Sequence, residues 1–137
     1  MKRYLITLFA LVVTATAAHA GWMAERFDAL SGSEWLVTEI AGQPAQGEAY
    51  LQFGSDGRLA GRTGVNHLSG SYLIEDARLR FGPLVTTRMA GSPELMEQEA
   101  RLTRALEQVD GFRRERIQLT LLDDGQPVLT LRQRDFD

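Results

Sequence analysis

The sequence predicts an α+β domain: a mostly antiparallel sheet of about eight short strands, curled or closed into a partly open barrel, with one amphipathic helix. Three observations carry this prediction. Apolar and polar residues alternate over short runs, Asp-Gly turns join neighbouring runs, and only one stretch, at about 92–110, has helical periodicity. Because the turns are short, we expect neighbouring strands to pair as hairpins, with the helix covering one side of the sheet.

The N-terminus is expected to be a signal peptide. Lys2-Arg3 forms a basic start, an apolar run follows from Tyr4 to Val13, and Ala18-His19-Ala20 forms a cleavage site. The apolar run is shorter than the roughly 20 residues that a membrane span needs. We therefore expect export to the periplasm, cleavage after Ala20 and no stable membrane span. No cysteine stands at the cleavage point, which excludes acylation as a lipoprotein.

Composition narrows the possible functions. Cleavage leaves 117 of 137 residues, enough for a lead-in segment at 21–32 and one domain at 33–134, which we expect to be monomeric. Removing the leader's two positive charges from a formal net charge of −3 leaves −5, which argues against nucleic acid as a partner. The chain has no cysteine, so thiol nucleophiles, thiolate metal sites and disulfides are excluded.

The first strand is predicted at 34–40, where Trp35 is the largest candidate for the core. Asp56-Gly57 between two apolar runs predicts a hairpin, and Gly82-Pro83 ends the next one. Tyr50, Phe53, Tyr72, Phe81 and Met89 are expected to pack in the core. The further strands expected before the helix are 50–53, 58–61, 68–74, 78–81 and 84–89.

The stretch from Gly61 to Tyr72 is rich in glycine and predicts a corner in the chain. Gly61, Gly64 and Gly70 leave little side chain to pack, so the backbone takes positive φ or approaches another strand closely. The change of direction is expected at 64–66. There, Asn66 is interpreted as a residue that bonds its own backbone rather than a substrate.

The helix is predicted from its ends as well as from its period. Ser92 is a good N-cap, Pro93 fits the first helical position, and Gly111 is expected to close the helix. One apolar stripe carries Leu95, Leu102, Leu106 and Val109. Strands at 116–122 and 128–132 are then expected to form a hairpin around an Asp-Gly turn at 123–126.

The order and spacing of these residues resemble the META domain, the family of the heat-shock protein HslJ, over about 33–132. The residues that carry the resemblance are Trp35, Asp56, Gly57, Gly61, Gly64, Asn66, Gly70, Tyr72, Thr87 and Met89. The resemblance implies a cracked β-barrel similar to that of some secretion pilotins and a role in envelope stress or export. It implies no established catalytic residues.

One departure from the family pattern concerns cysteine. Members commonly carry Cys at the positions of Val65 and Gly91, and both are replaced here, as expected if the two cysteines are bonded elsewhere in the family. A lost bridge costs a few kcal/mol, so we expect burial of Val65 to offset part of it.

No catalytic, cofactor-binding or metal-binding residue is predicted. His67 is the only histidine left after cleavage, which excludes a two-histidine metal site, and no carboxylate near it in sequence would orient its ring. Asp123-Asp124-Gly125 lacks the rest of a calcium loop and is interpreted as a turn.

Arg113, Arg114 and Arg116 form the densest basic spot, expected in a solvated loop just after the helix, or else as a contact for an acidic partner or a lipid head group. Two functions remain open. One is a non-catalytic periplasmic interaction or envelope-stress module with an unknown protein partner. The other is a small carrier that holds a lipid or another apolar ligand in a barrel cavity of about 300 Å³ or more.

Overall fold

The computed structural model describes residues 30–134, so the predicted signal peptide and nearly all of the lead-in segment lie outside the described residues. One helix, α2 (Pro93–Gln108), interrupts a series of strands. The strands are β1 (Ser33–Ile40), β2 (Gln43–Pro44), β3 (Ala49–Phe53), β4 (Arg58–Thr63), β5 (His67–Glu75), β6 (Arg78–Phe81), β7 (Val85–Thr86), β8 (Gly111–Glu115), β9 (Gln118–Asp123) and β10 (Gln126–Gln133).

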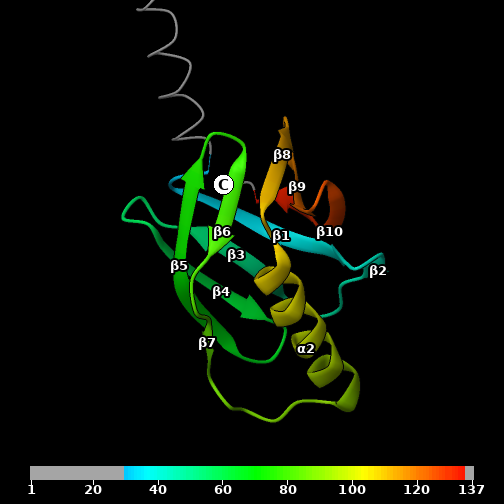
Figure 1. Ribbon diagram of the computed structural model, residues 1–137. Coiled ribbons are helices and arrows are strands. Elements are labelled where there is room, and N and C mark those ends of the chain that lie inside the picture. Colours follow the sequence, from blue (N-terminus) through cyan, green and yellow to red (C-terminus); the bar gives the residue numbers. More distant parts are fainter. Residues whose placement is uncertain (1–29, 135–137) are drawn as a thin grey trace, which may run out of the picture.

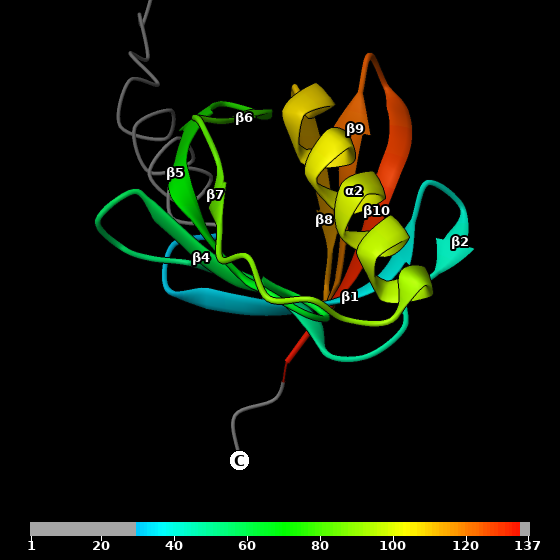
Figure 2. The same cartoon turned by 90° about the horizontal axis from the view of Figure 1, so that it is seen from below.

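The strands form one curled antiparallel sheet in the order β6-β5-β4-β3-β1-β10-β9-β8 (Figure 1). Short strands lie beside it, with β2 paired to β1 and β7 to β5. Figure 2 shows the curl, with β5, β6 and β7 on one arm and β8, β9 and β10 on the other. Two backbone hydrogen bonds join the arms, from Leu79 N to Asp110 O at 3.3 Å and from Phe112 N to Ala77 O at 3.2 Å. The result is a nearly closed eight-stranded barrel with one helix, which confirms the predicted fold class.

The turns confirm the hairpins that Asp-Gly predicted. Gly57 has φ of +79°, and Asp124 and Gly125 have φ of +48° and +78°. At Asp124-Gly125, two successive residues with positive φ produce a turn whose twist matches that of the flanking strands, whereas in the turn between β3 and β4 Gly57 alone has positive φ. Each turn therefore has the backbone conformation that its Asp-Gly sequence favours.

The interior of the barrel is packed with side chains from the strands and from α2. Trp35 and Phe53 are fully buried, and the ring of Tyr72 meets Phe53 edge-on with centroids 5.0 Å apart. The helix α2 packs against β1, β4 and β6 and buries Leu102 and Leu106. Because helix and sheet share one apolar cluster, the helix completes the core instead of lying on an already finished sheet.

The start of α2 is as predicted, but its end is not. Ser92 accepts a hydrogen bond from Leu95 N at 3.3 Å, and Pro93 is the first helical residue. At the other end Val109 caps the helix with extended backbone, and Gly111 begins β8 instead of closing the helix. The predicted loop at Arg113 and Arg114 is therefore a strand.

The pattern hid β8 because its inward positions are occupied by Phe112 and Arg114. These two residues pair with Leu121 and Leu119, whose side chains lie in the core. An arginine at an inward position breaks the alternation that marks a half-buried strand. The predicted strand at 116–122 accordingly starts later, at Gln118, after a turn in which Arg116 has φ of +55°.

The segment at 84–89 was predicted as a full strand with Met89 in the core. Only Val85 and Thr86 form a strand, and the Met89 side chain is 50% exposed. The physical reason is that the chain turns away from β5 after β7 and crosses to α2 (Figure 1). Residues 87–89 therefore have no neighbouring strand with which to continue the β-ladder.

The glycine corner yields a first prediction, for the variant Gly64→Val. Gly64 has φ of +106°, and a Cβ there would lie 3.0 Å from Gln98 Nε2 and 3.3 Å from Gln46 O. We expect a loss of about 1–2 kcal/mol from backbone strain, with crowding added to it. Urea unfolding of Gly64→Val and Gly64→Ala measures this loss.

Gly125→Ala is the matched control, since Gly125 also has positive φ but nothing lies within 4 Å of its Cβ position. It reports strain alone. An unchanged melting temperature for Gly64→Val would contradict the prediction.

Candidate functional site

The corner between β4 and β5 is a tight, hydrogen-bonded reversal of the chain. Thr63 N donates to Asn66 O at 2.9 Å, and the Thr63 hydroxyl accepts from Asn66 N at 3.0 Å. Gly64 supplies the positive φ that the reversal needs. The corner that the glycines predicted is therefore confirmed, and it delivers the side chain of Asn66 into the protein.

Asn66 is 1% exposed, and its amide makes four hydrogen bonds. Its Nδ2 donates to Met89 O at 3.1 Å and to Glu99 Oε1 at 2.8 Å. Its Oδ1 accepts from Met89 N at 2.6 Å and from the Thr87 hydroxyl at 2.9 Å. Both donors and both lone pairs are thus used, as a buried amide requires.

The bonds of Asn66 reach much further than the local turn that the sequence suggested. The side chain connects the corner to residues 84–89, which we call the crossing segment, through Thr87 and Met89. It also connects the corner to α2 through Glu99. We call this set, Thr63, Asn66, Thr87 and Glu99, the Asn66 hub. The Thr87 hydroxyl also accepts a hydrogen bond from His67 N at 3.0 Å, and Thr87 N donates one to His67 O. The hub holds the crossing segment against β5.

A second buried amide, Gln98, braces the other side of the corner. It is 1% exposed and donates to Thr63 O at 3.0 Å and to Gln46 O at 2.8 Å, while accepting from Gln46 N at 2.7 Å. The sequence analysis missed Gln98 and Glu99. The available signal was the position of Gln98, three residues after Leu95 and four before Leu102, which places it on the apolar stripe.

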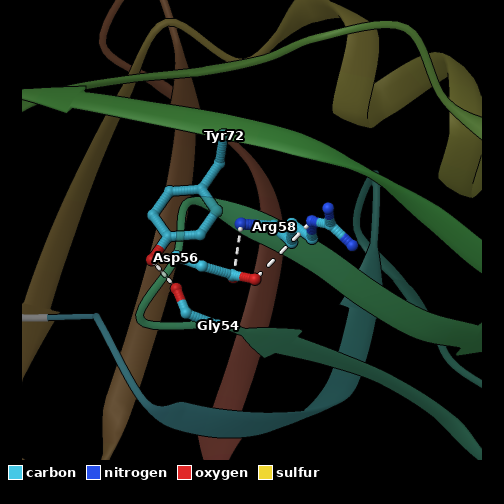
Figure 3. A network of polar contacts seen from close by, with 4 residues as sticks. All are labelled: Gly54, Asp56, Arg58 and Tyr72. Atoms are coloured by element: carbon cyan, nitrogen blue, oxygen red, sulfur yellow. Dashed lines mark hydrogen bonds and ion pairs between the residues drawn. The ribbon is translucent and has the colours of Figure 1, made fainter.

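At the end of β4 that lies away from the corner, Tyr72 of β5 closes the β3–β4 turn (Figure 3). Its hydroxyl donates to Gly54 O, and Asp56 accepts from Arg58 N at 3.1 Å. Burial raises the pKa of Tyr72 above its usual range, the hydroxyl of Ser31 opposes this by hydrogen bonding, and the charge of Asp56 adds to it. The phenol therefore stays protonated, as a donor must.

A cleft of about 340 Å³ lies beside Tyr72, between the β3–β4 turn and β5. Ser31, Ser55 and Asp56 line it on one side, and Leu73 and Ile74 on the other. Leu73 is 58% exposed, so the cleft opens to solvent instead of leading into the core.

The remaining motif residues make close backbone contacts or lie in the core. A Cβ on Gly61 would lie 2.4 Å from Tyr50 O, and one on Gly70 would lie 3.0 Å from Pro83 O. These glycines permit close approach of the backbone. Trp35 donates to the Ser33 hydroxyl at 2.7 Å and fills the core.

The three basic residues proposed for a partner have different surroundings. Arg114 lies 5.0 Å from the ring centre of Trp35 and donates to Gln133 Oε1 at 3.3 Å, so it covers the end of the core. Arg113 pairs with Glu115 at 3.1 Å on the outer face. Arg116 lies in the exposed turn after β8. The structure thus does not gather the three into one patch.

A further ionic cluster, missed in the sequence, lies on the outer face of the sheet. Arg134 pairs with Glu48 at 2.5 Å and with Glu34 at 3.6 Å, and its guanidinium lies 5.1 Å from the ring centre of Tyr50. The hydrogen bond from Arg134 lowers the pKa of Glu48. These contacts tie the end of β10 to β1 and β3.

Groups suited to catalysis do not converge in the described residues. His67 is exposed on β5, and within residues 30–134 its imidazole has no hydrogen-bond or ion-pair partner. No cluster of three or more metal-ligating side chains occurs in the same range. Among the described residues, no helix is long and apolar enough to cross a membrane.

The fold and the corner define a small, nearly closed antiparallel β-barrel domain with one helix, braced by buried amides. The model of the META domain matches residues 28–135, and the chain belongs to the META domain family. No curated protein matches the chain.

Solved structures have a similar fold. An NMR structure of a protein from Burkholderia xenovorans is 26% identical, with a TM-score of 0.66, and the match covers 82% of this chain and 88% of that one. A crystal structure of a DUF4847 family protein from Bacteroides vulgatus is 13% identical, with a TM-score of 0.63 over 83% of this chain and 99% of that one. At this identity, the second likeness shows the fold alone.

The two positions where family members commonly carry cysteine lie side by side. A Cβ built on Gly91 would lie 3.5 Å from the Cβ of Val65, within the range of disulfides. It would also lie 2.7 Å from a methyl group of Val65. Val65 is 8% exposed. Its methyl groups occupy the space left by the missing side chain of Gly91, and they bury apolar surface at the place where a disulfide would lie in other family members.

The Asn66 hub leads to a prediction for Asn66→Asp. The change removes two donors and sets a carboxylate against Glu99, so we expect a loss of about 3 kcal/mol at pH 7. Lowering the pH lets one carboxyl take up a proton and donate to the other, so the gap to the parent protein narrows. Urea unfolding at pH 7 and pH 5 measures both effects.

Adding Glu99→Gln to Asn66→Asp restores a donor between the two positions and is expected to recover most of the stability. If Asn66→Asp alone were as stable as the parent at pH 7, the hub would not hold the corner in the way described.

The pairing of positions 65 and 91 predicts that the double variant Val65→Cys, Gly91→Cys forms a disulfide on oxidation. Closing this loop is expected to stabilise the oxidised form by about 3 kcal/mol over the reduced form. Thiol titration and melting with and without reductant measure it. Each single cysteine variant serves as the control, and failure of the double variant to oxidise would contradict the proximity.

Proposed function

We propose that this META-domain protein is a non-catalytic interaction module that acts after export, in the periplasm, in the response to envelope stress. One observation carries the proposal. Met89 is bonded through both its N–H and its C=O to the buried Asn66, while its side chain is 50% exposed. A surface segment held this firmly loses little entropy when a partner binds, which favours affinity.

The chemistry of this segment also fits recognition of a partner. Val85 is 65% exposed, Met89 is half exposed, and Arg88 stands between them in the chain. Methionine and arginine are enriched in interfaces, and apolar side chains left in water on a rigid segment mark contact sites. The leader-like sequence at residues 1–20 supports export.

A carrier of a lipid or apolar ligand is the second candidate, and the cleft beside Tyr72 favours it. Its volume of about 340 Å³ is within the range of ligand pockets. The cleft is open and partly lined by Ser55 and Asp56, whereas the barrel interior holds Trp35, Phe53 and the other core side chains. The packed interior supports the interaction module over the carrier.

Site-specific photocrosslinking in cells tests the proposed function. A photoreactive amino acid is placed at Val85, at Arg116 or at Gln52, the last being exposed on the outer face of β3 and serving as the matched control. We expect a discrete adduct in the periplasmic fraction from Val85, absent from Gln52, with more adduct under envelope stress. Equal labelling at all three positions would contradict the proposal.

Native mass spectrometry of protein purified from periplasm distinguishes the interaction module from the carrier. We expect the bare polypeptide mass and no uptake of fatty acid or phospholipid. A lipid-sized molecule released on denaturation would instead favour the carrier.

A further inference from the structure

The described chain begins at the wall of the cleft beside Tyr72. Leu30 is fully buried in the core, and Gly32 N donates to Phe53 O at 2.7 Å, so the point of entry into the domain is held in place. Ser31, between these two residues, lines the cleft. The residues before Leu30 are therefore joined to the domain beside this cleft.

The cleft presents an apolar wall to solvent. Its volume is about 340 Å³, and Leu73 and Ile74 form one side of it. Among the large apolar side chains that are exposed in residues 30–134, Leu73 is the one that lines this cleft, and it is 58% exposed. Covering Leu73 with another apolar side chain removes both from water, which is favourable.

The segment that precedes Leu30 supplies apolar side chains for such a cover. Signal-peptide cleavage leaves nine residues, 21–29, which we call the tail, and its large apolar residues are Trp22, Met23 and Phe27. Three residues of fully extended chain span at most about 11 Å, so the Cα atom of Phe27 lies within that distance of the Cα atom of Leu30. The ring of Phe27 is therefore within reach of the cleft.

The charges on either side of Phe27 match those at the rim of the cleft. Arg26 precedes it and Asp28 follows it. At the rim, the carboxylate of Asp56 lies 3.6 Å from the guanidinium of Arg58, and both side chains are more than half exposed. An exposed ion pair is weakly held, so each partner stays available to a further opposite charge. The tail thus offers a cation for Asp56 and an anion for Arg58.

We propose that the tail of the mature protein folds over the cleft and packs Phe27 against Leu73. A segment of the same chain competes for the cleft at an effective concentration on the order of millimolar, so an outside lipid binds only by displacing the tail. The chain therefore covers its own cleft. This inference takes signal-peptide cleavage from the proposed function and is independent of the partner proposed there.

Thiol labelling of the mature protein, residues 21–137, tests this contact, since the chain has no cysteine of its own. Leu73→Cys places one thiol in the cleft. Ile117→Cys, at a 49% exposed apolar position in the β8–β9 turn, is the matched control. We expect adding Phe27→Ser to speed maleimide labelling at position 73 at least fivefold and to leave position 117 unchanged. An unchanged rate at position 73, or an equal rise at both positions, would overturn the proposal.

A disulfide trap measures independently where the tail lies. Phe27→Cys is combined with Leu73→Cys in one variant and with Gln52→Cys in the other. Gln52 is exposed and lies next to Phe53, whose carbonyl accepts from Gly32 N, so both positions are near the point of entry. We expect the first pair to oxidise at least tenfold faster than the second. Equal rates would overturn the proposal, because the tail would then have no preference for the cleft.

Native mass spectrometry of the parent protein tests a lipid as the occupant of the cleft. We expect the bare polypeptide, and a copurified lipid in the cleft would overturn the proposal. Adducts from Val85 in cells report a surface outside the cleft. Adducts without trapping of the tail would refute this inference alone, and trapping without adducts would refute the interaction module alone.

Discussion

The structure depends on the buried amide of Asn66. Four hydrogen bonds from one side chain join the β4–β5 corner, the crossing segment and α2, which are far apart in sequence. Apolar packing alone tolerates small shifts of one element against another, but a buried amide is costly unless every donor and acceptor is met. The arrangement that satisfies Asn66 therefore specifies where the crossing segment lies.

Those parts of the fold that are set by local chemistry could be predicted from the sequence. Asp-Gly at 56–57 and 124–125 favours a turn through its own backbone preferences, and Ser92-Pro93 begins a helix wherever that helix packs. The strand β8 depends instead on distant residues. Arg114 occupies an inward position because the ring of Trp35 lies beneath its guanidinium, and Trp35 comes 79 residues earlier in the chain. No pattern within 111–115 contains that information.

The same division applies to the site. Gly64 and Asn66 were singled out because glycine and asparagine carry a backbone signal of their own. Gln98 and Glu99 carry none, since a polar residue on a helix is usually solvated. Glu99 joins the hub, and Gln98 braces the corner, only because α2 docks against the corner, which is a tertiary event. The sequence thus identified Asn66 at the corner and missed Glu99, which accepts its hydrogen bond from α2.

An open sheet edge is a hazard, because it invites pairing with other chains. Proteins commonly limit this by keeping the edge short and placing charges on it, and β7 has two residues with Arg88 close by. Yet Val85 stays exposed, and the hub holds the segment rigid instead of letting it fold over the edge. The short length of β7 and the charge of Arg88 therefore limit the pairing of this edge with other chains.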